Sequence, residues 1–238
     1  MNKLTELEQT MKDLANEKKA KTMQKYFKSG KGEYGEGDEF IGLTVPIQRL
    51  IAKDFYKDLS LNEIEKLLQS GIHEHRLTAI LMLVLKYEKT KSQELRNQIV
   101  EFYLRNTLRF NNWDLVDSGC YKIIGHYAFH QNREDILYKL AESENLWEKR
   151  IAIVSTFHFI KNKSLQIVPE IVLMNVNHPH DLMHKANGWM LREMGKIDEA
   201  VLLDFLDSYA TQLPRTSLRY AIEKLDVSLR QYYLKLKD

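Results

Sequence analysis

The chain has 238 residues, of which 44% are hydrophobic and 29% charged. This balance is typical of a folded globular protein with one domain or a short repeat array, and it excludes a disordered or fibrous chain. The net charge of +2 neither indicates nor excludes a nucleic-acid partner, because a DNA footprint depends on clustered basic residues.

Glycine and proline are scarce, at 10 and 4 residues, which favours a mostly helical protein over a β-rich one. The single cysteine, Cys120, excludes an internal disulfide and a cysteine-based zinc site, and it suits a reducing compartment. The longest apolar run, residues 79–85, is too short to span a membrane, and the N-terminus has no apolar signal segment. We therefore expect a cytoplasmic protein without a membrane partner.

The first 58 residues are expected to hold helices interrupted by a glycine-rich segment. Apolar side chains between residues 4 and 14 recur at steps of three and four, which is the spacing of one helical face. A second helix is predicted to stop at Gly30. Residues 30–44 have no helical period, and we predict an extended or mobile loop there, followed by a helix near Pro46.

Residues 60–212 show a repeated helical pattern. Ser60 and Glu63 have the spacing of a capping box, which predicts a helix start at Leu61. Helix-like stretches then begin about 36 residues apart, a period typical of helical-hairpin repeats. These stretches are residues 73–87, 111–125, 146–160 and 182–196. Helices in residues 214–238 are expected to cap the array.

The repetition predicts an all-α fold in a single domain, residues 1–238. Under a shift of 36 residues Leu146 pairs with Leu182 and Lys149 with Lys185, so the repeat is visible in residues as well as in length. Stacked two-helix units place equivalent positions on one concave face, where residues from successive units can act on the same partner. Because both ends are predicted to be capped, we also expect a monomer.

Trp113 and Asp117 form the most informative pair in the chain. They are four residues apart, so they share a helical face and place an aromatic ring beside a carboxylate. Arg150 follows one repeat later, and Trp189 follows one repeat after that, with Arg192 three residues on. A single tryptophan more often fills the core between helices, whereas two in register beside charged groups favour a site, so both interpretations stay open.

Three stretches resemble the AlkD family of bacterial DNA alkylation repair glycosylases, which are built from HEAT-like repeats. They are NNWDLVDS (111–118), LWEKRIAI (146–153) and KANGWMLRE (185–193), and the resemblance extends from KYF at residue 25 to RTSLRYAIEKL at 215–225. It implies a right-handed superhelical solenoid with a concave DNA-binding face. It also implies a monofunctional glycosylase, without lyase activity, metal or cofactor, that excises N3- or N7-alkylated purines from double-stranded DNA.

The resemblance implies roles for individual residues. Asp117 matches the catalytic aspartate, which would stabilise the positive charge that develops on the deoxyribose or orient the attacking water. Trp113 and Trp189 match a pair of tryptophans whose ring faces favour a cation. Arg150 matches an arginine near the lesion, and Tyr26 matches a tyrosine of the same site. The other candidates for contacts to DNA phosphate are Lys149, Lys185, Arg192, Arg215 and Arg219.

An acidic insertion bears on the strength of DNA binding, and the repeat alone keeps a second function open. Four carboxylates in residues 33–39 occupy a connection that is shorter in the family, and they would repel phosphate unless the loop points away from DNA. The repeat alone also fits a non-catalytic module that binds branched or distorted DNA, or a protein, through the same face. Salt-sensitive DNA affinity without base release would favour this module.

Three shorter patterns are not interpreted as sites. Residues 30–35 match G-x-G-x-x-G, but a helix precedes them where a dinucleotide-binding motif needs a strand. His180 and His184 lie one helical turn apart but lack the glutamate of a zinc protease motif. His73 and His75 are two residues apart and so diverge on a helix. We therefore predict no metal site.

Overall fold

The computed structural model describes residues 2–236, which are helical apart from turns, loops and one isolated parallel bridge between Glu39 and Ile72. The prediction of an all-α fold is confirmed. The chain forms two compact units, one ending at Gly119 and the other beginning at Cys120. The single domain and its superhelical handedness remain predictions.

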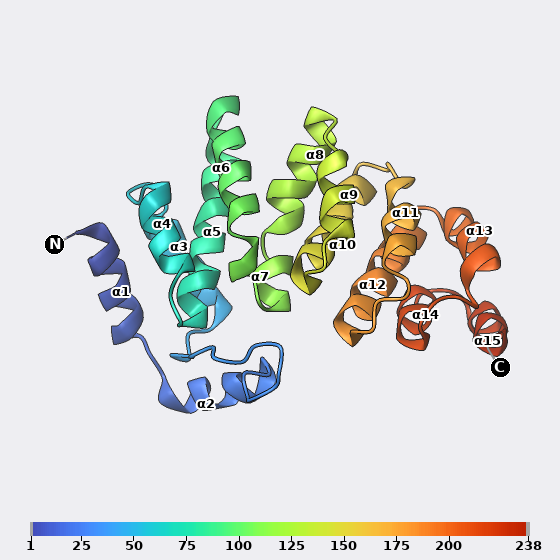
Figure 1. The fold of residues 1–238 in the computed structure, drawn as a ribbon, viewed down its shortest axis with the longest axis horizontal. Helices are drawn as coiled ribbons and strands as arrows, with labels where there is room; N and C mark the ends of the chain where they lie inside the picture. The colour runs from blue at the N-terminus through green and yellow to red at the C-terminus, as the bar shows by residue number, and fades with distance from the viewer. Residues whose placement is uncertain (1, 237–238) are drawn as a thin grey trace. The chain divides into compact units, whose positions relative to one another are not determined.

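The first unit is built around one buried helix, α5 (His73–Lys89). Helices α3, α4, α6 and α7 all contact it, and α1 packs on α3. Figure 1 shows α2 running crosswise to α1 and α3. The unit contains α1 (Lys3–Asp13), α2 (Glu17–Tyr26), α3 (Val45–Phe55), α4 (Leu61–Leu68), α5, α6 (Gln93–Arg105), the 3₁₀ turn η1 (Thr107–Arg109) and α7 (Trp113–Asp117).

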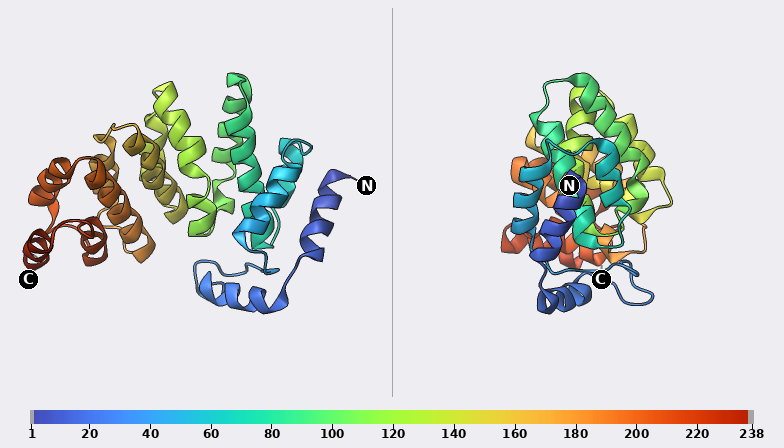
Figure 2. Two further views of the ribbon diagram at one scale, coloured as in Figure 1. Left: turned by 180° about the vertical axis from the view of Figure 1, so that it is seen from behind. Right: turned by 90° about the vertical axis from the view of Figure 1, so that its left-hand side faces the viewer.

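The second unit has two central helices, α10 and α12. Helix α10 contacts η2, α9, α11 and α12, while α12 also contacts α11, α13 and α14 (Figure 1; Figure 2 gives two further views). The elements are η2 (Tyr121–Gly125), α8 (His126–Gln131), α9 (Asp135–Glu142), α10 (Leu146–Lys161), α11 (Ile167–Met174), α12 (Asp181–Ile197), α13 (Glu199–Tyr209), α14 (Arg215–Ala221) and α15 (Val227–Lys235).

Local signals in the sequence locate several helix ends. Ser60 and Glu63 form the predicted capping box, and α4 begins at Leu61. Helix α3 begins at Val45, one residue before Pro46. The last helix of the cap predicted within residues 214–238 is α15, which ends at Lys235, and residues 237–238 lie outside the described part of the chain.

The predicted helix over residues 111–125 is wrong as one continuous element. Helix α7 covers only Trp113–Asp117, Ser118 and Gly119 form a turn, and residues 121–125 form one turn of π-helix. Gly119 lies so close to α5 that an added Cβ would be 2.7 Å from Cγ2 of Ile80. The chain comes this close to α5 directly after α7 ends. The spacing of apolar residues along the sequence could not predict this contact between distant residues.

Residues 30–44 contain no helix, as predicted, and the start of α5 holds the second half of this loop through hydrogen bonds. The amide of Glu39 donates to the Gly71 carbonyl at 3.0 Å, and the His73 amide donates back to the Glu39 carbonyl at 2.8 Å. The buried carboxylate of Glu74 accepts the amides of residues 41–43 at 2.7–3.2 Å. A carboxylate without these donors would be costly to bury, so Glu74 and the loop depend on each other.

Gly42 provides a test of how tightly this loop is held. Its φ is +83°, and an added Cβ would lie 2.1 Å from the Asn16 carbonyl oxygen. We expect Gly42→Ala to lower the free energy of unfolding by at least about 2 kcal/mol, since backbone strain and a backbone clash combine. Gly32 has a similar φ of +79° with nothing within 4 Å of the added Cβ. Gly32→Ala should therefore cost only about 1 kcal/mol. Equal losses in urea unfolding would contradict the tight anchoring of residues 41–43.

Candidate active site

Helix α7 presents Trp113 and Asp117 at the surface of the first unit. The Asn112 side chain caps the helix by accepting the Trp113 amide at 3.0 Å. The three residues between Trp113 and Asp117 are buried, whereas both end residues are half-buried. The predicted shared face is therefore the solvent-accessible side of this short helix.

Aromatic side chains from the end of α2 support the Trp113 ring. Phe27 stacks on it with ring centroids 5.6 Å apart and an interplanar angle of 26°. Tyr26, which is 64% exposed, meets it edge-on at 6.1 Å. The Asn112 side chain also donates to the Phe27 carbonyl at 3.1 Å. The structure thus brings together Tyr26 and Trp113, two of the residues that the resemblance implicates.

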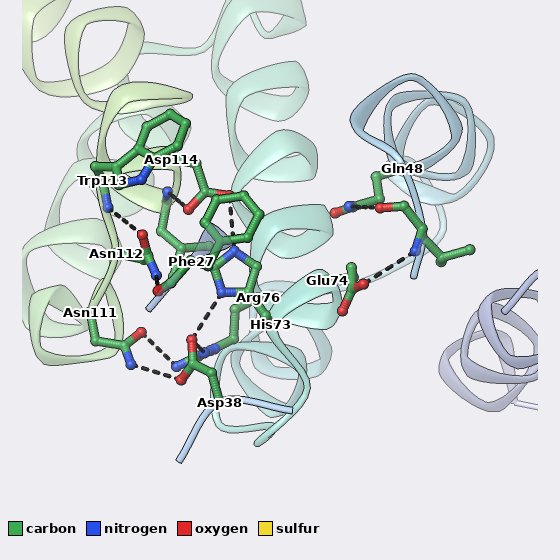
Figure 3. A network of polar contacts seen from close by, with 12 residues as sticks. Phe27, Asp38, Gln48, His73, Glu74, Arg76, Asn111, Asn112, Trp113 and Asp114 are labelled. Atoms are coloured by element: carbon green, nitrogen blue, oxygen red, sulfur yellow. Dashed lines mark hydrogen bonds and ion pairs between the residues drawn. The ribbon is translucent and has the colours of Figure 1, made fainter. Parts of the chain in front are cut away.

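A buried charge network lies behind these rings (Figure 3). The His73 imidazole bonds Asp38 through Nδ1 and Asp114 through Nε2, both at 2.9 Å. Arg76 pairs with Asp38 at 2.5 Å, and Asn111 bridges them by accepting from Arg76 and donating to Asp38. With His73 protonated, two carboxylates face two cations, so burial leaves no net charge in the network.

The network holds the proton on His73. Burial alone would lower the pKa of His73, but the Asp114 and Asp38 carboxylates outweigh burial and raise it to about 9. Burial likewise opposes ionisation of Asp38, yet hydrogen bonds from His73 and Arg76 hold the pKa of that carboxyl below its usual value. His73 is therefore an imidazolium at neutral pH.

His73 connects the network to Trp113 in two ways. Its ring stacks on Phe27 at 5.0 Å and on Phe40 at 4.7 Å, and Phe27 in turn stacks on Trp113. Its Nε2 holds Asp114, the residue next to Trp113 in the chain. The sequence prediction missed His73. The sequence did carry a signal, because four polar or charged residues, HEHR, precede a long apolar run in the same helix. The structure buries all four, and buried charged side chains are rare unless they are paired.

The acidic segment 33–39 exposes fewer carboxylates to solvent than its sequence contains. Asp38 is buried and ion-paired within the network. Glu33 accepts the Gly30 amide and Glu36 the Gly32 amide, each at 2.8 Å. Asp38 is thus a structural anion, so the carboxylates that face solvent are Glu33, Glu36 and Glu39.

In the second unit, Trp189 and Arg150 lie on the central helices. Trp189 is half-buried on α12, and its ring lies 6.0 Å from that of Phe157 on α10. Arg150 is only 5% exposed, and its Nη1 donates to the Leu182 carbonyl at 2.6 Å, joining α10 to the start of α12. Trp147, by contrast, is 8% exposed and belongs to the core.

Of the five remaining residues predicted to bind phosphate, four have partners within the protein and one is exposed to solvent. Lys149 donates to the Ala141 carbonyl at 2.9 Å, and Arg215 to the Leu234 carbonyl at 2.7 Å. Lys185 pairs with Asp181 at 2.7 Å, Arg192 pairs with Glu223 and Glu193, and Arg219 is exposed. Surface ion pairs contribute only about 0–1 kcal/mol, so a phosphate can compete for Lys185.

The two histidines at the start of α12, which were not predicted to bind a metal, have structural partners. His180 accepts the Leu182 amide through Nδ1 at 3.1 Å, and His184 Nε2 donates to the His178 carbonyl at 2.6 Å. Across residues 2–236, no group of three or more His, Cys, Asp or Glu side chains has a geometry that would hold a metal ion.

Comparison with known proteins assigns the family. The sequence model of the DNA alkylation repair enzymes matches residues 7–225, which is most of the chain. The chain belongs to the DNA alkylation repair enzyme family. The structure of a predicted DNA alkylation repair enzyme from Enterococcus faecalis is similar in fold, with a TM-score of 0.71 and 19% sequence identity. The similarity covers 90% of this chain and 97% of that one. No curated protein matches the sequence.

Membership of the DNA alkylation repair family gives the chain a role in DNA repair. Within the described part of the chain, no helix is both long and apolar enough to cross a membrane. The predicted site residues fall into two groups, with Tyr26, Trp113 and Asp117 in the first unit and Arg150 and Trp189 in the second.

Proposed function

We propose that the protein is a DNA glycosylase that hydrolyses the N-glycosidic bond of N3- or N7-alkylated purines. Alkylation at a ring nitrogen makes the base cationic, so it leaves the sugar as a neutral molecule. Water adds to C1′ of the deoxyribose, its proton is lost, and an abasic site remains. No metal or cofactor is needed, because the lesion itself is the activated leaving group.

Asp117 is the proposed catalytic residue. Breaking the C1′–N9 bond builds positive charge on the sugar, and a nearby carboxylate stabilises that charge by Coulombic attraction. The same carboxylate can orient the attacking water and accept its proton. The observation that supports this role best is the pairing of a half-buried Asp117 with a half-buried Trp113 on the open side of α7.

Trp113 and Trp189 are proposed to contact the damaged nucleotide. Indole faces attract a cation by about 0.5–2 kcal/mol per contact, which favours both the alkylated base and the polarised C–H groups of the sugar. Trp113 is well suited to this, because the stack of Phe27 and His73 fixes the ring before DNA binds. Tyr26 at its edge would contact the same nucleotide.

The basic side chains are proposed to hold duplex DNA through its backbone. Exposed Arg219 can reach phosphate directly. The other four side chains must exchange their present partners, and these are Lys149, Lys185, Arg192 and Arg215. Arg150, which is almost fully buried, would act from the junction of α10 and α12. We further propose that the protein acts as a monomer in the cytoplasm.

Release of alkylated bases tests the proposal directly. Purified protein is incubated with methylated duplex DNA, and free 3-methyladenine and 7-methylguanine are quantified against a protein-free sample. We expect release well above the spontaneous rate. DNA binding with no release above that rate would contradict the glycosylase and support a non-catalytic module that binds DNA.

A further inference from the structure

Three aromatic rings form a row across the second unit, and we call Tyr121, Phe157 and Trp189 the aromatic row. The ring centroids of Tyr121 and Phe157 are 5.4 Å apart, and those of Phe157 and Trp189 are 6.0 Å apart. The rings come from η2, α10 and α12 in turn, and all three side chains are half-buried. Trp189 is therefore the end of a larger aromatic surface and not an isolated ring.

A lysine lies over this row. The ammonium of Lys161 lies 4.5 Å from the Phe157 ring centroid and 5.2 Å from that of Tyr121. Lys161 is exposed and follows Phe157 by four residues, so both occupy the same face of α10. The combination of a cation with two rings is the pattern by which proteins bind a nucleic-acid strand without reading its sequence.

Lys161 differs from the basic residues that the sequence singled out. Arg192 is paired with Glu223 and Glu193, and Lys185 with Asp181. Lys161 makes no ion pair with any carboxylate in residues 2–236, and its ammonium instead contacts the Tyr121 and Phe157 rings. A phosphate that approaches Lys161 therefore displaces only a weak cation–π contact at the surface.

We propose that the aromatic row and Lys161 bind the sugar–phosphate backbone of a DNA strand next to the nucleotide contacted by Trp189. This inference rests on the proposed function for the role of Trp189. The rings pack against deoxyriboses or unstacked bases, and the Lys161 ammonium pairs with a phosphate. The row is up to about 11 Å long. At about 3.4 Å of rise per nucleotide, this length corresponds to about three nucleotides.

Equilibrium binding to an undamaged duplex tests the row independently of catalysis. Affinity is measured by fluorescence anisotropy at several salt concentrations for the full-length protein and its variants. Lys161→Gln should weaken binding about fivefold or more and reduce the slope of log K against log salt by about one, because one phosphate contact is lost. Lys161→Arg should restore both. Lys139→Gln, which removes an exposed lysine from α9, is the matched control and should change neither.

The rings are tested by a variant that keeps an apolar side chain and removes the π face. Phe157→Leu should weaken binding about threefold or more while leaving the salt slope unchanged, since no charge is lost. Circular dichroism melting identifies variants that fold as the parent does. The proposal is overturned if either folded variant, Lys161→Gln or Phe157→Leu, binds like the parent, or if the parent has no measurable affinity for undamaged DNA.

The outcome for the row can be separated from that for the glycosylase. Parent protein that releases alkylated bases while Lys161→Gln keeps full affinity leaves the proposed function intact and overturns the row. Parent protein that releases no base, but whose DNA affinity depends on Lys161 and Phe157, supports the row and contradicts the glycosylase.

Discussion

Replacing Asp117 with asparagine is expected to slow single-turnover release of the alkylated base by about 100-fold or more. The substitution keeps the size of the side chain and removes its charge, so it deletes the attraction to the developing cation on the sugar. Preorganised electrostatic contacts of this kind contribute about 3 kcal/mol or more to a transition state, which corresponds to this change in rate. The measurement is base release with enzyme in excess over a duplex containing one 7-methylguanine.

The control for this prediction is Asp54→Asn. Asp54 is an exposed aspartate on α3 of the same unit, so the chemical change and the change in net charge are identical. Its release rate should equal that of the parent. A folded Asp117→Asn protein that is as active as Asp54→Asn would remove Asp117 from the mechanism.

Replacing His73 with alanine is expected to lower the free energy of unfolding by about 3–5 kcal/mol. The change leaves the buried carboxylates of Asp38 and Asp114 without the cation between them, and breaking a buried pair in this way is strongly destabilising. It also removes the ring beneath Phe27. Urea unfolding followed by Trp113 fluorescence, in a background where Trp147 and Trp189 are both replaced by phenylalanine, reports the loss in the first unit.

The pH dependence of stability tests the same network without a disruptive substitution. The pKa of His73 is raised to about 9 in the folded protein, from 6.5. Its stabilising contribution is therefore complete below pH 6.5 and is lost as the pH rises through about 9. The shift corresponds to about 3 kcal/mol. In His73→Gln, the free energy of unfolding should change much less between pH 6.5 and 9.

A neighbouring histidine supplies the control for the pH experiment. His75 bonds the Ser70 hydroxyl, and burial lowers its pKa, so it is already neutral above pH 6.5. His75→Gln should therefore retain the parent's decline in stability between pH 6.5 and 9. If the parent shows no decline in this range, His73 is not a buried imidazolium.

Local patterns in the sequence predicted the parts of the structure that depend on neighbouring residues. The capping box at Ser60 and Glu63 located the start of α4, and the four-residue step from Trp113 to Asp117 gave their common face. These features follow from the geometry of one helix, which any chain with those residues shares.

Contacts between distant residues could not be predicted in the same way. His73 bonds Asp38 and Asp114, which are 35 and 41 residues away, and no local pattern links the three. The spacing between His73 and His75 correctly indicated that they diverge, but it gave no reason to look for other partners. The same limit explains why the anchoring of residues 41–43 was not predicted, since Glu74 bonds them from 31–33 residues away.

The most direct test of the central claim is to identify the products of repair in ¹⁸O-labelled water. Full-length protein is incubated with a duplex containing one 7-methylguanine, and both products are analysed by mass spectrometry. Hydrolysis at C1′ predicts free 7-methylguanine, released faster than without protein, and ¹⁸O in the abasic sugar. Unmodified guanine left in the strand, or base release no faster than the spontaneous rate, would contradict a glycosylase.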